Sequence, residues 1–311
     1  MSWNPRTLPP LAGKTFVVTG ANAGLGYFTS EQLAAAGAHV VLACRNPDRA
    51  DAALAALRGR VQGASVSTIT LDVADLESVR SASESLLQFP RIDGLILNAG
   101  IVHPPRDRQV SPDGNELVFA TNYLGHFALT AQVLPALLRT PGSRVVSLGS
   151  MISRLMDSAL DDLQLETGYD LWKAYAQSKI AMQVFGFELD RRLRESGVGG
   201  PAGVQSMVAH PGYSISGLTS GIPGVNEPTR RKRVIGGLPL AIGAQGKHQG
   251  AWPIVRSAVD PDAVGGQYYG PRWLTRGRPA RQAPTRTSRD AAIAARLWSR
   301  SEALLGVPFP A

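Results

Sequence analysis

Tyr175 and Lys179 carry the side chains whose types and spacing most directly indicate chemistry in this sequence. A separation of four residues puts a phenol and an ammonium on one face of a helix. A tyrosine has an ordinary pKa of about 10, so it can exchange a proton near neutral pH only if neighbouring positive charge lowers that pKa. Alone, such a pair is usually a solvated helix face. Here it follows the predicted strand 145–146 and the segment that ends in Ser150 (VVSLGS, 145–150), so the pair is a candidate acid–base site.

A glycine-rich segment, residues 19–26 (TGANAGLG), follows the apolar run 16–18 and leads into a helix-like stretch. Gly20, Gly24 and Gly26 permit a tight turn there, and they let backbone N–H groups and the positive end of the helix approach a pyrophosphate. Glycines that merely turn the chain are the alternative. The strand before them and the helix after them favour a dinucleotide site.

These motifs lie in an alternation of short apolar strands and Ala/Leu-rich helices, which is typical of βαβ units. We predict strands at 16–18, 40–42, 66–71, 95–97, 145–146 and 204–208, with a weaker seventh at 267–269. Helices are predicted at 27–36, 48–58, 75–87, 123–139 and 175–196, with Asn46 as an N-cap before Pro47. The fold class is α/β, a Rossmann-type doubly wound parallel sheet of about seven strands with helices on both faces. No repeat of solenoid length divides it, so residues 1–311 are predicted to form a single domain.

Two segments depart from this alternation. Residues 213–250 mix Gly and Pro with isolated apolar residues and predict a substrate lid that leaves the sheet. Residues 271–311 form a basic C-terminal extension in which 276–279 is expected to be an exposed loop. Residues 291–305 carry enough apolar side chains for a helix that covers the sheet or a partner subunit.

The formal charge of +8 is concentrated in this later part of the chain. Residues 1–225 hold 18 Lys and Arg against 19 Asp and Glu, whereas residues 226–311 hold 14 against 5. Binding of nucleic acid or anionic membrane stays open, but the arginines lack interleaved aromatic residues, so a solvated basic surface is favoured and Arg230–Arg233 is expected to be an exposed loop. No stretch reaches the roughly 18 apolar residues of a membrane span, and the N-terminus lacks a signal-peptide core. With Cys44 as the lone cysteine, we expect a cytoplasmic protein without disulfides or a metal site.

The glycine spacing TGxxxGxG, followed by Tyr-x-x-x-Lys, resembles the short-chain dehydrogenase/reductase family. The 25 residues from Ser150 to Tyr175 exceed the gap of compact members and resemble the retinol-dehydrogenase-like branch. The resemblance implies that Tyr175 is the general acid/base and that Lys179 lowers its pKa and holds the nicotinamide ribose. It assigns Ser150, ahead of the weaker candidate Ser147, to the substrate oxygen, and Asn122 to a water that returns the proton.

The resemblance also implies the cofactor contacts. An NAD site would place an acidic residue after the second strand, but Arg45 stands at that position. Its guanidinium is suited to the 2′-phosphate, so NADP(H) is favoured over NAD(H) as the cofactor. In the segment after residue 210, Ser216 replaces the usual threonine and Ser214 an aliphatic residue. The residues expected around the cofactor are Gly20, Asn22, Gly24, Leu25, Gly26, Arg45, Asp72, Val73, Asn98, Ala99, Gly100, Tyr175, Lys179, Pro211, Gly212, Ser214 and Ser216.

The combined expectation is an NADP(H)-dependent oxidoreductase that interconverts a carbonyl and an alcohol on a lipophilic small molecule. A catalytically silent NADP(H)-binding regulatory protein is the alternative, which the presence of Ser150, Tyr175 and Lys179 disfavours. We expect no nucleic acid partner and no membrane span. Assembly into a homo-oligomer stays open.

Overall fold

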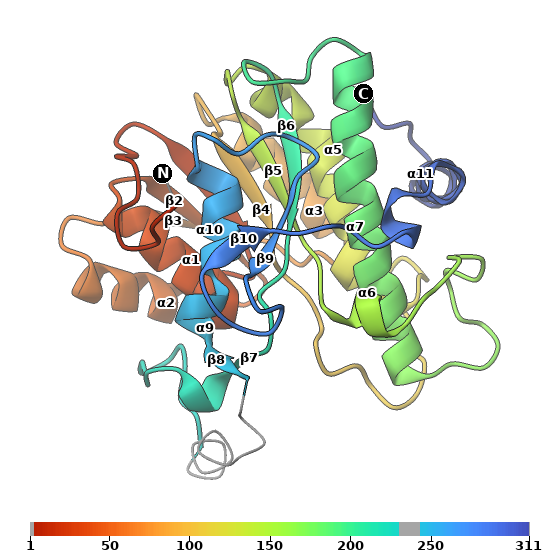
Figure 1. Cartoon of the computed structure of the whole chain (residues 1–311), viewed down its shortest axis with the longest axis horizontal. Helices are drawn as coiled ribbons and strands as arrows, with labels where there is room; N and C mark the ends of the chain where they lie inside the picture. The colour runs from red at the N-terminus through yellow and green to blue at the C-terminus, as the bar shows by residue number, and fades with distance from the viewer. Residues whose placement is uncertain (1–2, 230–242, 311) are drawn as a thin grey trace.

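An eight-stranded sheet with helices on both faces forms the centre of the molecule in the computed structural model, which describes residues 3–229 and 243–310 (Figure 1). The strand order is β10-β9-β6-β5-β4-β1-β2-β3, and every pairing is parallel except that of β9 with β10. The strands are β1 (Thr15–Thr19), β2 (His39–Cys44), β3 (Ser65–Thr70), β4 (Gly94–Leu97), β5 (Arg144–Leu148), β6 (Gln205–Ala209), β9 (Tyr268–Pro271) and β10 (Pro279–Arg281). The predicted fold class is therefore confirmed, with one strand more than the seven expected.

Helices cover the two faces of the sheet in two separate hydrophobic layers (Figure 1). One layer packs α1 (Gly24–Ala35), α2 (Pro47–Arg60) and α10 (Trp252–Val259) against the sheet. The other packs α3 (Leu76–Leu87), α5 (Gly125–Leu138), α7 (Leu171–Glu195) and α11 (Ala291–Leu305). The shorter helices are α4 (Leu117–Phe119), the π-helix η1 (Ala120–Leu124), α6 (Ile152–Leu155), η2 (Ser216–Leu218), α9 (Lys247–Gly250) and η4 (Thr287–Arg289). Across the described part of the chain, no helix is both long and apolar enough to cross a membrane.

Local sequence explains where several helices begin. The Asn46 side chain accepts a hydrogen bond of 2.9 Å from the backbone N–H of Arg49, and Pro47 follows at the first helical position, as predicted. Asp75, Asp170 and Asp290 cap α3, α7 and α11 in the same way. In contrast, α1 begins at Gly24 with no side-chain cap, so its first N–H groups are left for another acceptor.

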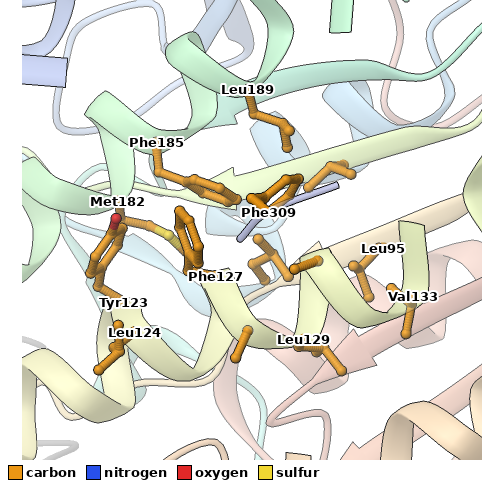
Figure 2. Packing of buried hydrophobic residues seen from close by; sticks show 14 of the residues in the cluster. Leu95, Tyr123, Leu124, Phe127, Leu129, Val133, Met182, Phe185, Leu189 and Phe309 are labelled. Atoms are coloured by element: carbon orange, nitrogen blue, oxygen red, sulfur yellow. The ribbon is translucent and has the colours of Figure 1, made fainter. Parts of the chain in front are cut away.

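The C-terminal segment contributes to both the sheet and the core. β10 lies within residues 271–311, where an extension was predicted, and pairs with β9 at the sheet edge. Helix α11 occupies the predicted residues 291–305, and its Trp298 is 2% exposed. Phe309 reaches the aromatic cluster of Phe127, Phe185 and Trp298, with ring centroids 5.0, 6.2 and 4.7 Å away. Figure 2 shows Phe309 beside Phe127 and Phe185.

The segment predicted as a lid begins and ends with ordered structure. Strand β7 (Ser214–Ile215) pairs in parallel with β8 (Gln245–Gly246), which brings the two ends of the segment together and leads directly into α9. Part of the predicted lid, together with the basic run Arg230–Arg233, lies outside the described residues. In the later extension, Arg276 and Arg278 are exposed, as expected of a loop, whereas Pro279 is buried in β10.

Candidate active site at the carboxyl ends of the strands

Ser150 and Tyr175 meet beyond the end of β5. The Tyr175 hydroxyl lies 3.4 Å from the Ser150 Oγ, to which it donates a hydrogen bond. Ser147, the weaker candidate, lies on β5 itself, where its Oγ is buried and has no hydrogen-bond partner among the described residues. A Cβ on Gly186 of α7 would lie 3.1 Å from that Oγ, so Ser147 packs against the helix and only Ser150 reaches Tyr175.

Burial dominates the proton equilibrium of Tyr175 in this structure. Desolvation raises the pKa of Tyr175, and the hydrogen bond with Ser150 opposes that rise. The direction is opposite to the lowering expected from the Tyr-x-x-x-Lys spacing. The phenol of Tyr175 is therefore protonated at neutral pH in the structure of the chain alone.

Lys179 lies one helical turn beyond Tyr175 and is fully enclosed. Its Nζ donates a hydrogen bond of 3.0 Å to the Leu148 carbonyl at the end of β5. Burial lowers the pKa of Lys179 to about 8. Desolvation, with a smaller contribution from the Lys179 ammonium, lowers the pKa of the buried His126 to about 3, so the imidazole stays neutral.

Asn122 lies in the π-helix η1, between α4 and α5, and is 0% exposed. Its Oδ1 accepts from the Ile101 N–H at 2.6 Å, while its Nδ2 donates to the Ile101 carbonyl at 3.1 Å and to the Ser178 Oγ at 2.9 Å. Ser178 precedes Lys179 on α7. The amide therefore ties the loop after β4 to the helix that carries Tyr175 and Lys179, and both of its N–H groups have partners within the chain.

The glycine-rich loop is closed so tightly that side chains would not fit. A Cβ on Gly26 would lie 2.4 Å from the Gly20 carbonyl oxygen and 2.5 Å from the Asn98 Nδ2. One on Gly20 would lie 2.9 Å from the Ala99 Cα. Gly24 has a φ of +58°, a backbone conformation that favours glycine. Asn22 lies two residues before Gly24, and Leu25 follows it directly.

A hydrogen-bond network joins this loop to the end of β4. Asn98 Nδ2 donates to the Thr19 carbonyl at 2.7 Å. The Thr19 Oγ1 accepts from the N–H groups of Asn98 and Ala99, both at 2.9 Å, and lies 3.0 Å from His126 Nε2. A Cβ on Gly100 would lie 2.8 Å from Asn122 Oδ1 and 3.6 Å from Lys179 Nζ, so the segment 98–100 borders both the loop and the acid–base group.

Arg45 and Asp72 stand side by side after β2 and β3. The Arg45 Nη1 lies 3.6 Å from Asp72 Oδ2, and 76% of the Arg45 side chain is exposed. An exposed ion pair at this distance is worth roughly 0–1 kcal/mol, so it does not prevent the guanidinium from turning to another anion. Val73 is buried, and its carbonyl oxygen would lie 1.8 Å from a Cβ on Gly125 at the start of α5.

The segment Pro211–Ser216 lies beyond the carboxyl end of β6. Gly212 has a φ of +65°, and a Cβ there would lie 2.2 Å from the Thr275 carbonyl oxygen. The Ser214 hydroxyl donates to the Pro211 carbonyl at 2.8 Å. Ser216 begins η2. The hydroxyl of Ser214 is thus used within the turn, whereas that of Ser216 makes no hydrogen bond to the described part of the chain.

These features fit a dinucleotide. The glycine loop, the uncapped N–H groups of α1 and the exposed Arg45 match a pyrophosphate and a further anion, and the exposed Gly100 lies beside Asn122 and Lys179. Within residues 3–229 and 243–310, no group of three or more His, Cys, Asp and Glu side chains is arranged to hold a metal ion.

A family model described as short chain dehydrogenase matches residues 14–221, which contain the glycine loop and the acid–base group. The chain belongs to the short-chain dehydrogenase family. Human retinol dehydrogenase 13 is 33% identical to this short-chain dehydrogenase over 96% of the chain and 87% of its own length. Mouse polyprenol dehydrogenase is 34% identical, over 98% of the chain and 87% of its own length. These relatives establish the protein as an oxidoreductase of alcohol and carbonyl groups.

Solved structures agree with this family membership. An uncharacterised protein of Mycobacterium paratuberculosis is 34% identical, covers all of both chains and superposes with a TM-score of 0.79. A candidate NAD(P)-dependent gluconate 5-dehydrogenase of Beutenbergia cavernae, solved with bound NADP, is 27% identical over 84% of this chain and 95% of its own, with a TM-score of 0.62.

Several residues around the site were missed from the sequence. Thr19, Ile101 and Ser178 hold the motif residues in place. Thr19 and Ser178 stand inside the two motifs and Ile101 follows Gly100, but the motifs do not predict these hydrogen bonds. Lys247 is a fourth residue that was missed. Its ammonium lies beside Gly24, although the two residues are far apart in the sequence. A second cation near the glycine loop could have been sought among the basic residues of the later part of the chain.

Proposed function

We propose that this short-chain dehydrogenase uses NADP(H) and that Tyr175 is its general acid/base. The observation that carries the proposal is that Tyr175 meets Ser150 beyond β5 while Lys179 and Asn122 border the exposed Gly100. The four side chains come from the loop after β5, from α7 and from η1. They also border the loop that would hold a dinucleotide.

The bound nicotinamide cofactor would supply the hydride. Tyr175 would donate its proton to a substrate carbonyl oxygen, and the Ser150 hydroxyl would hold that oxygen as negative charge develops on it. Lys179 would hold the ribose hydroxyls and favour the phenolate after transfer. Asn122 would fix the active-site helix through Ser178 and line the route by which water returns the proton.

The cofactor preference rests on Arg45. Its exposed guanidinium stands at the end of β2, where a carboxylate would instead select the ribose hydroxyls of NAD(H). Asp72 and Val73 would lie against the adenine. The remaining predicted contacts, Gly20, Asn22, Gly24, Leu25, Gly26, Asn98, Ala99, Gly100, Pro211, Gly212, Ser214 and Ser216, would surround the pyrophosphate and the nicotinamide.

We propose a lipophilic aldehyde, ketone or alcohol as substrate. The retinol and polyprenol dehydrogenases that resemble this chain are named for lipophilic alcohols. The exposed Tyr213 and Leu218, in the segment predicted as a lid, would add apolar surface at the site. A panel of carbonyl compounds assayed with NADPH tests this assignment, and turnover confined to small hydrophilic sugars would contradict it.

Tyr175→Phe tests the function itself. The variant removes one hydroxyl, so we expect NADPH binding to persist while turnover falls by about 10²–10⁴-fold, the usual contribution of a positioned general acid. Unchanged turnover would remove Tyr175 from the mechanism. Wild-type protein that binds NADPH but turns over no member of the panel would favour the alternative of a silent regulatory protein.

We further propose that residues 1–311 act as one domain in the cytoplasm. The lone Cys44 is buried and unbonded, which fits a compartment where disulfides are not used. A homo-oligomer stays a proposal to be tested by sedimentation.

A further inference from the structure

We propose that Lys247 binds the pyrophosphate that NADPH and NADH share, as a second cation of the nucleotide site. The inference rests on the proposed function, because it assigns one more residue to the same site. Lys247 lies beyond residues 14–221, which the family model matches, so the shared motifs do not include it.

The chain returns to the glycine loop through β8 and α9. Strand β8 pairs with β7, directly after the turn at Pro211 and Gly212, and α9 then packs against α1. The packing is close: a Cβ on Gly250 would lie 2.1 Å from Ser214 Oγ and 2.9 Å from Leu25 Cδ2. The Gln32 side chain of α1 donates to the His248 carbonyl at 3.1 Å, which holds the two helices in register.

This arrangement aims the Lys247 side chain at the start of α1. A Cβ on Gly24 would lie 3.2 Å from Lys247 Nζ, 3.7 Å from its Cδ and 3.9 Å from its Cε. The backbone N–H of Lys247 donates to the Thr219 Oγ1 at 2.8 Å, so the base of the side chain is fixed. The ammonium therefore lies beside the turn where the glycine loop becomes a helix.

The electrostatics at this point favour an anion. The N-terminus of α1 carries about half a positive charge from its aligned peptide dipoles, and its first turn contains no acidic residue. An ammonium here adds a full charge and charge-assisted hydrogen bonds to phosphate oxygens. Because the side chain is partly buried, solvent screens it less than it screens Arg45.

Two cations at separate places would contact different phosphates. Arg45 lies at the end of β2 and would contact the 2′-phosphate, which only NADPH carries. Lys247 lies at the start of α1 and would contact the pyrophosphate, which both nucleotides carry. The two roles can therefore be distinguished by comparing the two nucleotides.

The test measures dissociation constants for NADPH and NADH by fluorescence titration of wild-type protein, Lys247→Gln and Arg45→Gln. Lys14→Gln is the matched control, because Lys14 is exposed just before β1, at the opposite end of the strand from the glycine loop. We expect Lys247→Gln to weaken both nucleotides by the same factor, about tenfold. Arg45→Gln should weaken NADPH alone, and Lys14→Gln neither.

Lys247→Arg keeps the charge and should recover most of the affinity, while a thermal melt checks that each variant is folded. A folded Lys247→Gln protein with unchanged affinities would overturn the inference. Weakening of NADPH alone would also overturn it, because it would place Lys247 at the 2′-phosphate. Wild-type protein that binds neither nucleotide would instead overturn the proposed function, and this inference with it.

Discussion

Replacing Lys179 with Met should reveal how much stability the buried ammonium removes from the fold. Lys179 is fully enclosed, and burial lowers its pKa from an ordinary 10.5 to about 8. At neutral pH the folded protein must therefore keep a charge in a site that disfavours it. The difference between the two pKa values corresponds to about 3 kcal/mol of free energy of unfolding.

The pH dependence has a definite sign. Between pH 8 and pH 10.5 the unfolded chain holds the Lys179 proton more tightly than the folded chain, so the stability of the wild type rises with pH relative to the variant. Lys179→Met lacks this titration. At pH 7 the variant no longer buries a charge, but the Leu148 carbonyl loses its hydrogen-bond donor, which costs about 1–3 kcal/mol. The free energy of unfolding of the variant should therefore equal or exceed that of the wild type.

Urea unfolding at a series of pH values from 7 to 10.5 measures both quantities. We expect the wild type to gain about 3 kcal/mol relative to Lys179→Met across this range. Burial holds the pKa of His126 at about 3, so the imidazole does not titrate in this range. The titration of Tyr175, whose pKa burial raises, is common to both proteins and is removed by taking the difference between them. Lys173→Met, which removes an exposed ammonium from the same helix, should show a constant difference. A constant difference for Lys179→Met as well would refute the reasoning.

Three further changes test the fold around the site. Gly26→Ala puts a methyl group 2.4 Å from the Gly20 carbonyl, so NADPH affinity measured by titration should fall more than tenfold; unchanged affinity would mean that the loop relaxes without loss. Trp298→Ala empties an aromatic cluster and should lower the free energy of unfolding by about 3–5 kcal/mol in urea, whereas a loss under 1 kcal/mol would contradict the core position of α11. Arg276, Arg278 and Arg281 are exposed arginines of the C-terminal extension. Replacing them with glutamine should leave NADPH-dependent turnover unchanged at every salt concentration, and a salt-sensitive loss of turnover would place function in the extension.

Local sequence patterns were enough to predict the helices and strands in which those patterns are strong. The β-branched runs located the strands to within one or two residues, and the amphipathic stretch 291–305 is α11. Strand β10 was missed because Pro-Ala-Arg lacks β propensity; proline is tolerated there because the strand lies at the sheet edge. The motif spacing placed Ser150 and Tyr175 together correctly, and the roles of the individual site residues stay predictions.

Other features depend on contacts that no local pattern encodes. Lys247 reaches Gly24 only because β8 pairs with β7 and α9 packs on α1. The pKa of Tyr175 follows from burial by surrounding elements, which outweighs the lowering expected from the lysine spacing. Asn122 was predicted from its motif, but its hydrogen bonds to Ile101 and Ser178 depend on a π-helical turn that the sequence pattern does not predict.

The aromatic cluster around Phe309 also governs when the protein can finish folding. Phe127 and Phe185 belong to helices in the first two-thirds of the chain, yet their partners Trp298 and Phe309 are synthesised much later. Ser301 of α11 also bonds to the Tyr123 hydroxyl at 2.7 Å, next to Asn122 in η1. During translation, α5 and α7 therefore expose an apolar surface until residue 309 has left the ribosome, and contacts of such long sequence separation form slowly. Nascent chains stalled before α11 should consequently bind chaperones more than full-length chains do.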